Sequence, residues 1–145
     1  MNSTDLSVLN AAVDWLKAGH SVAIATVVQT WGSAPRPIGS WVAIRDDGQV
    51  TGSVSGGCVE DDLIRRVQTE ILTKELPERV VYGVSQQEAA RFGLPCGGTL
   101  RLVQEPVKDV AWIEEVLHRT SSHQLVARTV KLSTGEITLL ESART

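Results

Sequence analysis

The sequence predicts an α/β fold of the α+β type, in which a mixed β-sheet with hairpins packs against about three helices. Segments with helical periodicity are interleaved with short β-branched segments, and two pairs of the latter carry hairpin signals. Because helices alternate with hairpins rather than with single strands, a mixed sheet is favoured over a purely parallel one. The length of 145 residues fits a single domain.

Apolar residues recur at helical spacing over residues 5–18, 59–73 and 106–119. Gly19 supplies a stop for the first of these helices, and Pro106 is expected to open the third. These three helices would bury their apolar stripes against the sheet. A further one or two turns of helix are expected in residues 85–92.

The strands are predicted from β-branched runs bounded by turn residues. The first run, SVAIATVVQ, is apolar enough to predict a strand buried on both faces. The turns DDGQ (46–49) and STG (133–135) each join two runs into a hairpin. The expected strands are residues 21–29, 41–45, 50–54, 79–84, 99–104, 125–132 and 136–140.

Composition excludes several classes of protein. The net charge is −3, from 14 Lys and Arg against 17 Asp and Glu, so a nucleic-acid partner is not expected. No apolar run is long enough to cross a bilayer and the N-terminus lacks signal-peptide features, so no membrane association and a cytoplasmic location are expected. Two cysteines in a reducing compartment argue against a disulfide framework.

Two glycine-rich segments contain the two cysteines. They are GSVSGGCVE (52–60) and GLPCGG (93–98), and five of the twelve glycines lie within three residues of a cysteine. Glycine removes the side chains that would cover a thiol and lets backbone amides approach a ligand closely. Each segment also adjoins a predicted strand. They are therefore the candidate functional segments.

Cys58 directly precedes a predicted helix, whose N-terminus favours an anion or a thiolate. The alternative is a tight turn in which Cys58 only fills space. Glu60 complements the helix dipole or, in a minority interpretation, accepts a proton from a ligand. Arg36, between two prolines, either contacts an anion or is solvated. No catalytic residue is assigned.

Several sharper motifs are absent from the sequence. It contains no Walker phosphate loop, no dinucleotide-binding fingerprint and no nucleophile elbow. A closed zinc site is not predicted, because two cysteines and three scattered histidines offer no recognisable ligand spacing. Two thiolates facing a soft or sulfur-bearing metal remain open, if the fold brings their segments together.

Together with TWGSAPRP (30–37), the segments GSVSGGCVE (52–60) and FGLPCGG (92–98) resemble the XdhC/CoxI family of xanthine dehydrogenase accessory factors. The resemblance implies a non-enzymatic chaperone that transiently binds the molybdenum cofactor, as molybdopterin or its dinucleotide form. It would assist sulfuration of the cofactor and its insertion into a molybdenum hydroxylase. Cys58 and Cys96 are the candidates for a molybdenum contact. The predicted cofactor-binding residues are Ser33, Arg36, Ser55, Gly56, Gly57, Cys58, Glu60, Cys96, Gly97 and Gly98.

The partners implied by the resemblance are the apo-hydroxylase, a cysteine desulfurase and a second copy of the chain in a homodimer. Many family members carry a second, Rossmann-like domain. The expectation here is a single domain over residues 1–145 without it, working with a separately encoded Rossmann-type partner. Two alternatives stay open: a sulfur transferase carrying a persulfide on Cys58, and a structural or regulatory subunit that has lost cofactor binding.

Overall fold

A computed structural model of the chain describes residues 3–31, 36–54, 58–71, 75–83, 87 and 99–141, with the backbone alone at Trp31, Cys58 and Glu141. Its helices are α1 (Ser3–Lys17), α2 (Cys58–Arg66), which continues as the π-helical turn η1 (Val67–Ile71), and α5 (Ala111–Ser121). Its strands are β1 (Val22–Trp31), β2 (Trp41–Arg45), β3 (Val50–Gly52), β4 (Glu78–Tyr82), β5 (Thr99–Pro106), β6 (Val126–Val130) and β7 (Ile137–Glu141). The predicted α+β class with three helices is confirmed.

Five of the strands form one sheet in the order β3-β2-β1-β5-β4, and β6 pairs with β7 in a separate hairpin. Every pairing among these strands is antiparallel. The long central strands β1 and β5 run side by side from Ala23↔Pro106 to Trp31↔Thr99, with a bulge between Val27 and Gln29. The end of β1, the start of β5 and the end of β4 are consequently neighbours at one end of the sheet.

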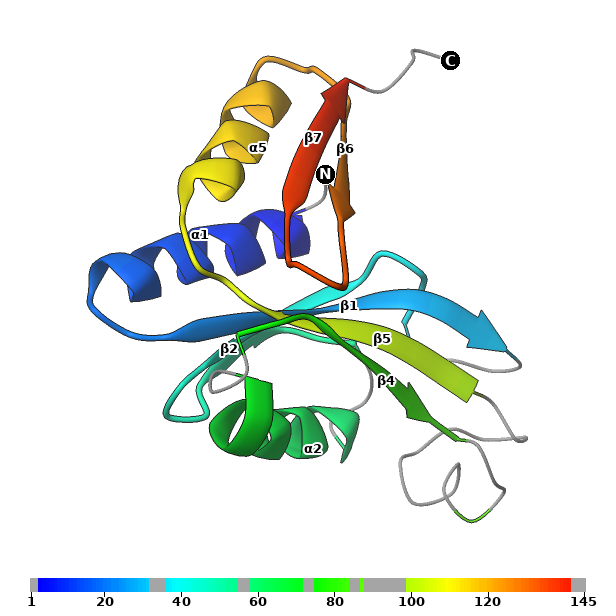
Figure 1. The fold of residues 1–145 in the computed structure, drawn as a ribbon. Coiled ribbons are helices and arrows are strands. Elements are labelled where there is room, and N and C mark those ends of the chain that lie inside the picture. The colour runs from blue at the N-terminus through cyan, green and yellow to red at the C-terminus, as the bar shows by residue number, and fades with distance from the viewer. Residues whose placement is uncertain are drawn as a thin grey trace.

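Helices cover both faces of this sheet (Figure 1). Helix α2 and η1 pack on one face, where alternate residues of β4 and β5 point into a mainly apolar core. Helix α1, α5 and the β6–β7 hairpin lie on the other face, over a second core that includes Val8, Ile24 and Ile113. The sheet is thus the middle layer of the described structure.

A buried ion pair attaches the β6–β7 hairpin to the sheet. The Arg128 guanidinium donates two hydrogen bonds to the Glu105 carboxylate, at 2.6 and 3.0 Å, and the two side chains are 13% and 3% exposed. The same guanidinium lies 4.4 Å from the ring centroid of Trp112 on α5. One arginine therefore joins the hairpin, the sheet and a helix.

The expectation that Pro106 opens the third helix is wrong. Pro106 is the last residue of β5, and α5 begins at Ala111. Strand β4 ends its pairing at Gln104, so β5 has only one neighbour at Pro106 and the missing N–H costs no hydrogen bond on the β4 side. Asp109 instead accepts a hydrogen bond from the Ala111 N–H at the true helix start.

Two smaller differences concern burial and length. Strand β1 is buried on both faces only in its first half, since Val28 is 42% exposed. Regular α-helix in the second helical segment ends at Arg66, where the chain widens into the π-helical turn. The expected helix in residues 85–92 lies outside the described residues apart from Gln87. Within the described part of the chain, no helix is long and apolar enough to cross a membrane.

Candidate functional site

The described residues cover part of the predicted site. Arg36 and Glu60 are described with their side chains, and Cys58 is described by its backbone. The remaining predicted residues lie outside the described ranges, so their placement stays a prediction: Ser33, Ser55, Gly56, Gly57, Cys96, Gly97 and Gly98.

Cys58 is the first residue of α2, as the glycine pair before it indicated. The first turn of a helix presents unpaired N–H groups and partial positive charge. The acidic residues Glu60 and Asp61 lie in this turn. Their charge suits that position, and this part of the expectation for Glu60 agrees with the structure.

Glu60 also has a more specific role. Its side chain is buried, 7% exposed, and its Oε1 atom accepts hydrogen bonds from the Val54 N–H at 2.8 Å and the Ser53 hydroxyl at 3.2 Å. The carboxylate therefore folds back onto the chain just after β3, much as a capping-box residue does. It fixes both ends of the short segment that contains Gly56 and Gly57.

The start of α2 is attached to the end of β4 through Asp62, one helical turn after Cys58. The Tyr82 hydroxyl donates a 2.5 Å hydrogen bond to Oδ2 of Asp62. Arg65 and Arg66 donate to the same carboxylate at 2.7 and 2.9 Å. Tyr82 is the last residue of β4 and is 2% exposed, so it holds the helix against the strand end.

The electrostatics of this contact favour a neutral tyrosine beside a charged aspartate. Burial alone would raise the pKa of Asp62, but hydrogen bonds from Tyr82, Arg65 and Arg66 outweigh it and lower the pKa to about 2. Burial, followed by the hydrogen bond to Asp62, raises the pKa of Tyr82 well above its usual value. The hydrogen bond thus persists across the physiological pH range.

The cysteine-bearing segments leave from the same end of the fold (Figure 1). Tyr82 pairs with Leu100 across β4 and β5, and residues 84–98, which include Cys96, connect these two strands. The Tyr82–Asp62 contact brings the start of α2 to that end. The structure therefore brings the backbone at Cys58 to the strands that flank the Cys96 segment.

Arg36 adds an unpaired donor in the loop that precedes β2. It precedes β2 in the loop whose Gly39 N–H donates to the Val27 carbonyl at 2.8 Å, beside the second half of β1. Its Nε atom is buried and, within the described structure, has no hydrogen-bond partner. A buried guanidinium N–H without an acceptor is costly, and an anion would satisfy it. The anion contact expected at Arg36 stays a prediction.

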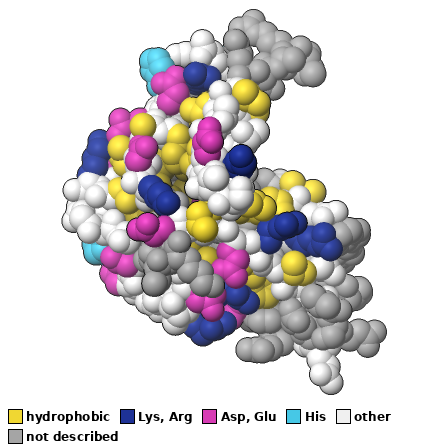
Figure 2. Space-filling model, in the orientation of Figure 1, with side chains coloured by type: hydrophobic (Ala, Val, Ile, Leu, Met, Phe, Trp, Pro, Cys, Tyr) yellow, Lys and Arg dark blue, Asp and Glu magenta, His cyan; other side chains and the backbone are white. Residues whose placement is uncertain are grey.

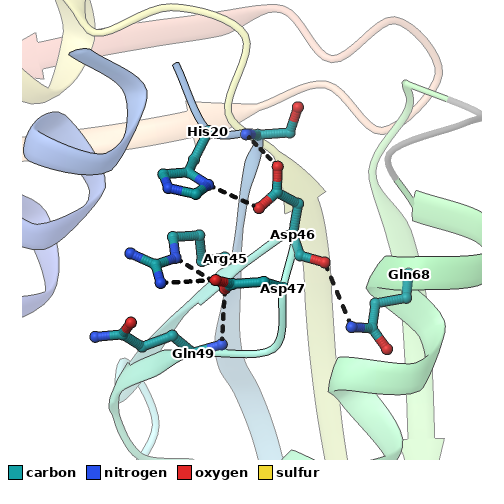
Figure 3. Close-up of polar contacts among 7 residues, drawn as sticks. His20, Arg45, Asp46, Asp47, Gln49 and Gln68 are labelled. Atoms are coloured by element: carbon teal, nitrogen blue, oxygen red, sulfur yellow. Dashed lines mark hydrogen bonds and ion pairs between the residues drawn. The ribbon is translucent and has the colours of Figure 1, made fainter. Parts of the chain in front are cut away.

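A second cluster of candidate metal ligands lies at the opposite end of β1 (Figure 3). His20, Asp46 and Asp47 have ligand atoms within 4.8 Å of one another. Asp46 already accepts from the His20 Nδ1–H at 2.9 Å and from the Ser21 N–H at 3.1 Å. Asp47 accepts two hydrogen bonds from Arg45, at 2.7 and 2.8 Å.

These contacts satisfy the carboxylates without a metal. The Ser21 backbone N–H and then His20 lower the pKa of Asp46, and the Arg45 guanidinium lowers the pKa of Asp47 to about 2. Gln68 donates to the Asp46 carbonyl at 3.3 Å and so ties the same turn to η1. The hydrogen bonds of this cluster connect the β2–β3 turn to the start of β1 and to η1.

Sequence reasoning missed Tyr82 and the specific role of Asp62. In the sequence, Asp62 is only one of the acids that follow Cys58. Tyr82 is the single tyrosine of the chain and immediately precedes a glycine at the end of a strand. That position could have drawn attention to it, but no local pattern indicates a partner twenty residues away.

By fold and site, the described residues form an α+β domain whose two cysteine-bearing segments attach at one end of an antiparallel sheet. A sequence model of the XdhC and CoxI family matches residues 15–83. The resemblance to the XdhC and CoxI family that the motifs indicated is confirmed over these residues.

Two curated relatives agree with this assignment. The molybdenum cofactor insertion chaperone PaoD of Escherichia coli (strain K12) is 30% identical over 122 residues, which are 83% of this chain and 37% of that protein. A probable xanthine dehydrogenase subunit of Bacillus subtilis (strain 168) is 27% identical over 134 residues, 86% of this chain and 39% of that protein. The chain thus spans less than two fifths of the length of either relative.

The fold also matches a solved structure. The crystal structure of a xanthine dehydrogenase from Bacillus halodurans superposes with a TM-score of 0.71 over 96% of this chain and 46% of that chain. Sequence identity is 24%, so the match shows a shared fold.

Proposed function

We propose that this chain binds the molybdenum cofactor, without turning it over, and passes it to a xanthine dehydrogenase-type molybdenum hydroxylase. Three described groups support the proposal. They are the first turn of α2 at Cys58, the strand ends that flank the Cys96 segment, and the unpaired donor of Arg36. The curated relative named as a cofactor insertion chaperone supports the same role.

The described groups fit an anionic, phosphate-bearing cofactor. The unpaired Nε–H of Arg36 and the first N–H groups of α2 are donors suited to a phosphate or another anion. Glu60 and Asp62 fix the two sides of the helix start, so these donors are held in place before binding. The glycines beside both cysteines would let the cofactor approach the backbone closely.

The cysteines would supply soft ligands. The charge at a helix N-terminus favours thiolate, and we propose Cys58, with Cys96, as the molybdenum-facing residues. When bound, the cofactor supplies the molybdenum chemistry that the acceptor hydroxylase needs. The chain's own residues would hold the cofactor and shield it from water. A cysteine desulfurase is the proposed sulfur donor during this stage.

The test is retention of the cofactor after gel filtration. Purified chain is incubated with molybdenum cofactor and desalted, and molybdenum and pterin are measured in the protein fraction. We expect close to one equivalent on the wild type, several-fold less on Cys58→Ala, and a smaller loss on Arg36→Gln. Lys131→Gln, on the exposed hairpin turn, is the matched control and should retain the wild-type amount.

Equal retention by wild type and Cys58→Ala would show that the role proposed for Cys58 is wrong. No retention by well-folded wild type would overturn cofactor binding by this chain alone. A persulfide on Cys58, transferred at a catalytic rate, would instead identify a sulfur transferase.

A further inference from the structure

A groove of about 370 Å³ opens between the β6–β7 hairpin and the sheet. Thr26 of β1 and Trp41 of β2 form its sheet side, and Leu125 and Val126 line its hairpin side. Leu125 is 56% exposed, although it is a large apolar side chain at the rim. Exposed apolar side chains beside a groove are typical of a surface that another molecule covers.

Thr26, on the sheet side of the groove, carries an unsatisfied hydroxyl. The Oγ1 atom of Thr26 is buried and has no hydrogen-bond partner in the described structure. A buried hydroxyl without a partner lowers stability, and native structures generally satisfy such groups. A backbone or side-chain group of a molecule seated in the groove would satisfy this one. The hydroxyl is therefore a second, independent indication of an occupant.

Two arginines extend the same face of the sheet beyond the groove. Thr26 pairs with Val103 on β5, and Arg101 lies two residues from Val103 on that face. Arg79, on β4, also pairs with Val103 and occupies the diagonal position to Arg101, about 7 Å away. Their strand neighbours point the other way, into the core against α2: Val80, Tyr82, Leu100 and Leu102.

Both arginine side chains are exposed. Arg101 donates to Gln29 Oε1 at 3.3 Å, and Arg79 makes no ion pair with the described residues. Val81 lies directly opposite Arg101 and is 39% exposed. Figure 2 shows basic and apolar side chains gathered over this part of the sheet, below the hollow beside the hairpin. The face is therefore cationic and partly apolar.

We propose that the groove and the arginine pair form the docking surface for an acidic segment of the apo-hydroxylase that receives the cofactor. The inference rests on the proposed function. Arginines beside apolar contacts recur at protein interfaces, and two cations on one face select a partner that presents carboxylates. The chain is acidic overall, so this local cationic face stands out from the rest of its charge.

The position of the face suits cofactor transfer. The arginine pair lies on β4 and β5. Together with β1, these strands continue to the end of the sheet where the candidate cofactor segments attach. An acceptor docked along them would lie beside the cofactor. The exposed Val81 and Leu125 favour a protein over a small anion, because a free phosphate gains nothing from apolar contacts.

The first test measures affinity for the cofactor-free xanthine dehydrogenase of the same organism, by biolayer interferometry at low and moderate salt. Arg79→Glu and Arg101→Glu should each weaken binding at least tenfold and reduce its dependence on salt. Lys131→Glu carries the same change of charge on the exposed hairpin turn and should leave the affinity within twofold of wild type.

The second test separates a binding role from a folding role. Thr26→Val removes the unsatisfied hydroxyl and keeps a β-branched side chain in the strand. It should leave the melting temperature unchanged or raised, because no hydrogen bond of the free chain is lost. It should nevertheless weaken acceptor binding several-fold. A merely structural residue would not show these opposite effects.

Cofactor retention is measured on the same samples. Wild-type affinity in both Arg79→Glu and Thr26→Val, with retention intact, would overturn the docking surface alone. Absence of acceptor binding by wild type would overturn it as well. Failure of the wild type to retain cofactor, with acceptor binding still sensitive to Arg79→Glu, would count against the proposed function and leave the surface standing.

Discussion

The Tyr82 hydroxyl donates a 2.5 Å hydrogen bond to the Asp62 carboxylate and thereby joins the end of β4 to the first turns of α2. One residue precedes the segment with Cys96, and the other follows Cys58 by one helical turn. The helix and the strand that adjoin the two glycine–cysteine segments are therefore joined by a contact between residues that neither segment contains.

Removal of the tyrosine hydroxyl should loosen this connection. Tyr82→Phe leaves the ring in the core but deprives a charged carboxylate of one donor, so we expect a loss of about 1.5 kcal/mol in the free energy of unfolding. Urea denaturation measures this loss, and cofactor retention should fall with it. Unchanged stability and retention would show that the arginines alone hold Asp62.

The pH dependence of stability should show an acid limb due to Asp62. Its pKa is lowered to about 2 in the folded chain from 3.8, so the stabilisation is fully present above about pH 4 and is lost as the pH falls toward 2. Asp47 shares a low pKa but is half exposed, and its pair with Arg45 should contribute little.

Urea denaturation of wild type and Asp62→Asn between pH 2 and pH 6 tests this assignment. Asp62→Asn should be less stable than wild type at pH 6, and the difference should shrink below pH 4. A difference that stays constant with pH would mean that the titration of Asp62 does not contribute to the acid limb.

The ion pair of Arg128 and Glu105 should behave as a buried pair. Arg128→Ala leaves the 3% exposed Glu105 side chain without its partner and is expected to cost about 3 kcal/mol. The double variant Glu105→Leu with Arg128→Met should recover most of that loss. Thermal denaturation of the three variants checks this, and a double variant no better than Arg128→Ala would contradict it.

Two glycines with nearly the same positive φ should respond differently to substitution by alanine. Gly52 (φ +90) lies so close to the Trp41 carbonyl and Val8 that an added Cβ would clash, whereas Gly39 (φ +91) has open space around it. Gly39→Ala should cost about 1 kcal/mol, from the left-handed backbone alone. Gly52→Ala should cost several times more by urea denaturation. Equal losses of stability in the two variants would show that β3 can move away from α1 to make room for the added Cβ.

Local patterns predicted the elements whose determinants are close in sequence. The turn DDGQ sets the β2–β3 hairpin, STG sets the β6–β7 hairpin, and the apolar stripe of α1 marks its buried face. The glycine pair before Cys58 also indicated correctly that a helix follows. In each case the chemistry that decides the conformation lies within about ten residues.

Contacts between distant residues could not be predicted in this way. The partners Tyr82 and Asp62 are 20 residues apart, and Arg128 and Glu105 are 23 apart, so each pairing depends on the order of strands in the sheet. Pro106 shows the same limit: a proline before an apolar stretch suggests a helix start, but its place in β5 follows from where β4 stops pairing.

The most direct measurement of the central claim is the transfer of cofactor to its acceptor. Cofactor-free xanthine dehydrogenase is mixed with the loaded chain, with an equal amount of free cofactor, or with cofactor and the Cys58→Ala variant, and recovered dehydrogenase activity is followed. The account predicts faster and more complete activation by the loaded wild-type chain than by either comparison. Equal activation in all three mixtures would contradict it.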